Sequence, residues 1–149
     1  SEYKQEEAWS EDPNVAPTRK MPRTPNYYGY FTLSSQPFKN FDVALSGVYT
    51  GRMHVPHFAP DPSEIPADFP YTYITQDELK HTSDFMDFNF KLNYTFLLNE
   101  HLKVQLNGGV QNIFNAFQKD FDKGTFRDSG YFYGPTQPRT YFVGIKIMN

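Results

Sequence analysis

The residues from Met86 to Phe96 alternate between apolar and polar side chains at every position. The apolar set has even numbers: Met86, Phe88, Phe90, Leu92, Tyr94 and Phe96. The polar set has odd numbers: Asp87, Asn89, Lys91, Asn93 and Thr95. A period of two is typical of a β-strand with one apolar face, because successive side chains point to opposite sides of a sheet. This segment therefore predicts a strand rather than a helix, with Lys91 on the polar side.

Four further segments alternate in the same way and predict strands centred near Phe31, Leu45, Leu106 and Val143. Short connections at residues 36–40 and 98–101 alternate with long, proline-containing ones at residues 53–83 and 113–138. A slip of one residue would exchange the two faces of a strand, so the pattern specifies the register strongly. The predicted fold is all-β, with antiparallel up-and-down strands and almost no helix.

The connection lengths and the aromatic positions favour a membrane β-barrel, in which short turns lie in the periplasm and long loops lie outside. Rings fall toward the outer strand ends at Tyr27, Tyr49, Phe88 and Tyr141. They fall toward the periplasmic ends at Phe41, Tyr94 and Phe96, with aliphatic side chains between the two groups. A soluble β-sandwich is the alternative, but it explains only the alternation. Because five strands leave open edges, the remaining strands are expected upstream in a longer parent chain.

Composition narrows the remaining classes of function. The net charge is -3, which argues against a nucleic-acid partner, and there are no cysteines to form disulfides or thiolate metal sites. No serine-histidine-aspartate order, phosphate-binding loop or metalloprotease helix is present, so we expect no enzymatic activity and no cofactor. Residues 1–25 are polar and proline-rich and predict an irregular extracellular loop, whereas residues 26–149 hold the predicted strands.

Two segments resemble the C-terminal end of TonB-dependent receptors. The run Gly109-Val110-Gln111-Asn112-Ile113-Phe114-Asn115 is similar to the penultimate-strand signature of that family. The run Pro138-Arg139-Thr140-Tyr141-Phe142-Val143-Gly144-Ile145 is similar to its final strand. The resemblance covers about residues 26 to 149, and it departs from the family at the end, Ile147-Met148-Asn149, where these barrels usually carry an aromatic residue.

The resemblance implies the C-terminal strands of a barrel of about 22 strands in the bacterial outer membrane. It also implies active import of a scarce nutrient, driven by TonB through an upstream plug that these residues do not contain. Expected partners are outer-membrane lipid and a small nutrient ligand, and a surface lipoprotein is a further candidate. Iron-siderophore, haem, cobalamin and oligosaccharide all stay open as the ligand. The alternatives are a passive pore or structural barrel and a soluble carbohydrate-binding β-sandwich.

Ligand contacts are expected on the long connections, where arginine and aromatic side chains offer hydrogen bonds and stacking surface. The candidates are Arg52, His54, His57, Phe126, Arg127, Tyr131 and Tyr133. The aromatic members could equally pack the loop onto its neighbours. Asp120-x-Asp122-x-Gly124 is similar to the start of a calcium loop but lacks the expected glutamate, so we expect a solvated loop and no metal site.

Overall fold

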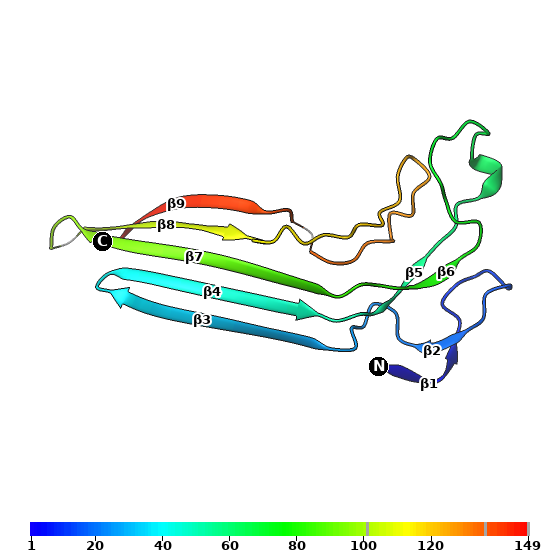
Figure 1. The fold of residues 1–149 in the computed structure, drawn as a ribbon, viewed down its shortest axis with the longest axis horizontal. Helices are drawn as coiled ribbons and strands as arrows, with labels where there is room; N and C mark the ends of the chain where they lie inside the picture. The colour runs from blue at the N-terminus through cyan, green and yellow to red at the C-terminus, as the bar shows by residue number, and fades with distance from the viewer. Residues whose placement is uncertain (101, 136, 149) are drawn as a thin grey trace. The chain divides into compact units, whose positions relative to one another are not determined.

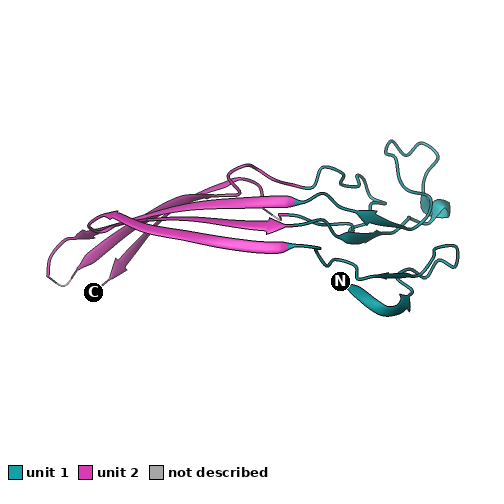
Figure 2. Ribbon diagram, turned by 60° about the horizontal axis from the view of Figure 1, so that its bottom comes forward, with its two compact units in different colours: residues 1–27, 51–84, 118–134 teal, residues 28–50, 85–117, 135–149 magenta. Residues whose placement is uncertain are grey.

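The computed structural model describes residues 1–100, 102–135 and 137–148, and the chain divides into two compact units (Figures 1 and 2). Unit 1 comprises residues 1–27, 51–84 and 118–134, and unit 2 comprises residues 28–50, 85–117 and 135–149. Unit 2 holds the five strands that the alternation predicts. Unit 1 holds the N-terminal segment and most of the two long connections.

Unit 2 is a five-stranded antiparallel sheet in which each strand pairs with the strand that neighbours it in the order β3-β4-β7-β8-β9. Its strands are β3 (Tyr28–Phe38), β4 (Phe41–Thr50), β7 (Phe85–Leu97), β8 (Lys103–Gln111) and β9 (Thr140–Met148). This confirms the predicted all-β antiparallel arrangement. Within the described ranges the sheet is open, with β3 and β9 at its edges, so it does not form a closed barrel.

The register of the sheet keeps the predicted faces intact along the strands, except at the end of β3, where it shifts between Ser35 and Phe38. Leu45 pairs with Leu33 on one side and with Phe90 on the other, so apolar residues lie opposite apolar residues. Lys91 pairs with Ala44 and Gly109 on the opposite face. Alternation along each strand then separates one apolar face from one polar face, as the sequence predicts.

The apolar face of the sheet is largely exposed. The side chains of Val143, Ile147 and Leu33 keep 89%, 70% and 63% of their accessible surface. In the described part of unit 2 the only buried hydrophobic residue is Phe85. The other buried hydrophobic residues of the described chain all belong to unit 1: Met53, Val55, Tyr131 and Tyr133. The sheet therefore presents an apolar surface that no second layer of unit 2 covers.

One predicted turn is shorter than the sequence suggests. The sequence predicts the first short connection at residues 36–40, but β3 continues through Phe38, which pairs with Phe41. Lys39 and Asn40 alone make the turn, and Asn40 has φ 64°, a left-handed conformation that asparagine tolerates. Pro37 fits within β3 because this is an edge strand and because the register is irregular between Ser35 and Phe38.

Unit 1 contains four short strands where the sequence predicts irregular loops. In the N-terminal segment β1 (Glu2–Glu7) pairs with β2 (Thr18–Lys20), which corrects the expectation of an irregular loop over residues 1–25. In the first long connection β5 (His54–His57) pairs with β6 (Glu78–His81), and the 3-10 helix η1 (Pro62–Glu64) lies between them. No helix in the described ranges has the length and apolar character needed to cross a membrane.

Candidate ligand-binding site

The two long connections share a buried polar centre within unit 1. Gln118, only 1% exposed, donates from Nε2 to the carbonyl oxygen of Tyr131 at 3.2 Å. Its Oε1 accepts from the backbone N–H of Tyr133 at 3.0 Å. A single side chain thus bridges the start and the return of segment 118–134, which has no regular secondary structure to satisfy its backbone groups.

Asp120 binds the hydroxyl groups of two of the predicted aromatic residues. Tyr131 donates to Oδ2 at 2.7 Å, and Tyr133 donates to Oδ1. Burial alone would raise the pKa of Asp120, but these hydrogen bonds outweigh it and lower the pKa below its ordinary value. Burial and the Asp120 contact raise the pKa of Tyr133 to about 12 and raise that of Tyr131 further. Both rings are held as neutral hydrogen-bond donors.

His57 connects the first long connection to the second. Its ring stacks on Tyr131 with centroids 3.8 Å apart, and Nε2 lies 2.7 Å from Oδ2 of Asp122. Its Nδ1 lies 3.3 Å from Oε1 of Glu78, the residue that pairs with it across β5 and β6. Asp122 also accepts from the backbone N–H of Asp128. Among the described residues there is no group of three or more histidine, cysteine or acidic side chains placed to hold a metal ion.

The seven predicted contact residues thus fall into two groups. Tyr131 and Tyr133 are buried in unit 1 at 3% and 7% exposure, which favours the packing role that the sequence left open for the aromatic residues. His57 is buried with them, at 5% exposure. The more accessible group is Arg52, His54, Phe126 and Arg127.

The accessible group is spread over unit 1. His54 stacks on its cross-strand partner His81 at 4.8 Å, and burial together with the charges of His81 and Lys20 lowers its pKa. Phe126 packs edge-on against Phe69 at 5.3 Å. Arg127 lines an open cleft of about 490 Å³, donating to the carbonyl oxygen of Gly124 at 3.3 Å. These side chains do not converge on one pocket, so they stay separate candidates.

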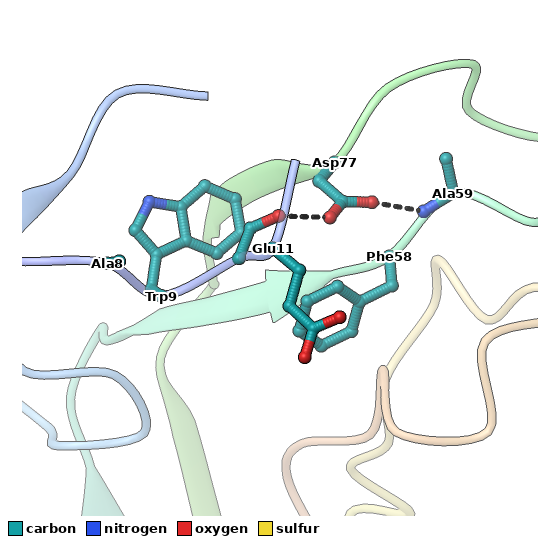
Figure 3. A pocket seen from close by; sticks show the side chains of 7 residues that line it. Ala8, Trp9, Glu11, Phe58, Ala59 and Asp77 are labelled. Atoms are coloured by element: carbon teal, nitrogen blue, oxygen red, sulfur yellow. Dashed lines mark hydrogen bonds between the residues drawn. The ribbon is translucent and has the colours of Figure 1, made fainter. Parts of the chain in front are cut away.

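A second cleft, of about 630 Å³, is formed by residues outside the predicted ligand contacts (Figure 3). It is lined by Ala8, Trp9, Ser10, Glu11, Phe58, Ala59 and Asp77. Phe58 follows β5 and Asp77 precedes β6, so the pairing of these two strands brings them together. Trp9 follows β1, and the neighbouring Ser10 donates to Asp77. The only tryptophan of the chain, placed in a polar segment, was the one available signal for this site.

Comparisons with known proteins leave the chain without an assigned relative. No family model matches it, and neither the curated proteins nor the solved structures contain a significant match.

Alkaline pH is expected to loosen segment 118–134. Because the pKa of Tyr133 is raised from 10.0 to about 12, its contribution to stability is complete below pH 10 and is lost as the pH rises through about 12. Tyrosinate absorbance should therefore show a late-titrating component whose appearance coincides with proteolytic sensitivity of this segment. Asp120→Asn should lower the pKa of that component toward the pKa of the exposed tyrosines. Ionisation of every tyrosine near pH 10, with the segment still protected, would contradict the role assigned to Asp120.

Proposed function

We propose that the five-stranded sheet is a membrane-spanning sector of a β-barrel whose apolar face contacts lipid. The exposed apolar face is the observation that carries this proposal. Antiparallel sheets in water normally pack their apolar face on a core and leave the polar face in solvent. Here the apolar residues Tyr141, Val143, Ile145 and Ile147 of β9 are all at least 67% exposed. A contiguous patch of this kind marks contact with a membrane or another apolar surface.

Aromatic contacts at the two ends of the sheet support this placement. Near the two-residue turn, the ring of Phe41 lies 6.3 Å from Phe38 and 6.3 Å from Tyr94, and Tyr94 lies 4.6 Å from Phe96. Toward the other end, Phe88 lies 5.3 Å from Phe114. Aromatic rings are favoured at both membrane interfaces, where an apolar body meets a polar boundary.

The opposite face of the sheet suits a hydrated barrel interior. It carries Lys91, Lys103 and Lys146. In the described part of the chain, Asp87 Oδ1 and Asn93 Oδ1 are buried without a hydrogen-bond partner. Buried oxygens of this kind normally find water or another polar group, and water or a plug inside a barrel would supply one.

We infer further that the parent protein is an outer-membrane receptor that imports a scarce nutrient with energy from TonB. The support is the resemblance of residues 109–115 and 138–145, which cover the end of β8 and the start of β9. Unit 1, built from the N-terminal segment and the long connections, offers clefts and exposed side chains for capture. A passive pore is the alternative, and we propose no catalytic role.

Nutrient uptake by intact cells tests this function. Cells that lose the protein should lose uptake of one member of a panel of labelled ferric siderophore, haem, cobalamin and oligosaccharide. A proton uncoupler should abolish that uptake, because active import consumes the proton-motive force. Arg127→Ala, an exposed position in unit 1, should reduce uptake at limiting nutrient, whereas Lys39→Ala in the short turn should not. Uptake that survives the uncoupler would identify a passive pore instead.

A further inference from the structure

The geometry of the cleft beside Trp9 points to a binding site for a small ammonium cation. Two aromatic rings, Trp9 and Phe58, form part of its wall with centroids 6.4 Å apart and planes tilted by 40° (Figure 3). A volume of about 630 Å³ is within the range of ligand pockets. The face of an aromatic ring is electron-rich and attracts a cation that sits over it.

The donors among the lining side chains already have partners. The indole N–H of Trp9 donates to the carbonyl oxygen of Ala16 at 3.0 Å. The hydroxyl of Ser10 donates to Asp77 Oδ2, and the backbone N–H of Ala59 donates to Asp77 Oδ1 at 2.8 Å. A ligand that needs donors from these groups, such as an anion, would find none available. A sugar needs donors as well as acceptors, so it is also poorly matched.

The remaining polar group is an acceptor. Within the described part of the chain, the carboxylate of Glu11 has no hydrogen-bond or ion-pair partner, and Glu11 lines the cleft together with Phe58 (Figure 3). The lining includes a second carboxylate, Asp77, and no lysine, arginine or histidine. The cleft wall thus combines aromatic ring faces with carboxylates that no basic lining residue neutralises, and such a wall favours a positively charged ligand.

This inference goes beyond the proposed function and does not depend on it, because the cleft belongs to unit 1 alone. Binding is measured on the purified chain, without transport. A failure to bind the cation would not bear on the membrane proposal. A failure of nutrient uptake would not bear on the proposed cation site.

Fluorescence of Trp9 reports directly on the site, because the chain contains no other tryptophan. Titration with choline is expected to give a saturable change in emission. The uncharged isostere 3,3-dimethyl-1-butanol should bind at least about tenfold more weakly, since the cation–π and carboxylate attraction is lost. Glu11→Gln and Phe58→Leu should each weaken choline binding by roughly tenfold. Glu64→Gln, an exposed acidic position outside the cleft, should have no effect and serves as the matched control.

Three results would overturn the assignment. Equal binding of choline and its uncharged isostere would make the cleft a purely apolar site. Saturable binding of maltose but not of choline would make it a carbohydrate site. No saturable change with any probe up to millimolar concentration, in a chain whose circular dichroism shows intact strands, would mean that the cleft is not a ligand site. If Glu11→Gln does not fold, two other measurements test the attraction between the cation and the cleft. High salt and the Phe58→Leu substitution should each weaken choline binding.

Discussion

Replacing Leu45 with lysine is expected to destabilise the sheet in a lipid bilayer by about 2–4 kcal/mol. Leu45 lies in the middle of β4, between Leu33 and Phe90 on the apolar face. A lysine there would place its ammonium group in hydrocarbon unless the side chain bends toward a membrane interface. Because the position is in the middle of the strand, both interfaces are far from it. The free energy of unfolding should be measured by urea titration of the parent protein in lipid vesicles.

The neighbouring position supplies a matched control for this prediction. Ser46 is adjacent on β4 but belongs to the polar face, where it pairs with Thr32 and Asn89. Ser46→Lys should therefore change the free energy of unfolding by less than about 1 kcal/mol, since a lysine on that face can remain hydrated. Equal losses for the two variants would remove the asymmetry between faces on which the membrane proposal depends.

The sheet could be predicted from the sequence because its residues satisfy two conditions together. Each strand alternates in polarity, and each stays in register with its neighbours, so Lys91 and Leu92 fall on opposite faces without any knowledge of contacts. The strand end that differs most from the prediction is that of β3, at Phe38, where an edge strand accepts a proline.

The short strands of unit 1 could not be predicted in the same way. The β1 sequence is mostly charged or polar and has no apolar face, and β5 is only four residues long with Pro56 inside it. Their pairing depends on partners that lie far along the chain, as His57 with Glu78 does. Local polarity carries no information about such pairings.

The candidate site shows the same limit. The predicted arginine, histidine and aromatic contacts on the long connections include residues that are buried in unit 1. Residue type alone could not separate the exposed Arg127 from the buried Tyr131. Gln118, which bridges the segment, gave no signal, because a lone glutamine in a polar stretch resembles a solvated one. The burial of these residues arises from the fold of the connection, which hydrogen bonds from the Gln118 side chain to the backbone stabilise. No periodic pattern in the sequence reveals such bonds.

Replacing Gln118 with leucine is therefore expected to destabilise segment 118–134 by about 2–4 kcal/mol. Leucine has a similar volume but cannot donate to the Tyr131 carbonyl oxygen or accept from the Tyr133 N–H. Each buried backbone group that loses its partner costs about 1–3 kcal/mol. Hydrogen exchange of the Tyr133 amide measures the effect and should accelerate by roughly 30- to 1000-fold.

Gln76→Leu is the matched control for this change. Gln76 is an exposed residue of unit 1 whose side chain makes a 3.4 Å bond to the carbonyl oxygen of Asn14, so the same substitution should leave exchange in segment 118–134 unchanged. The strands of unit 2 should keep their exchange protection in both variants, because their hydrogen bonds lie within the sheet. Unchanged exchange of the Tyr133 amide in Gln118→Leu would mean that the aromatic contacts of Tyr131 and Tyr133, and not the glutamine bridge, hold the segment in place.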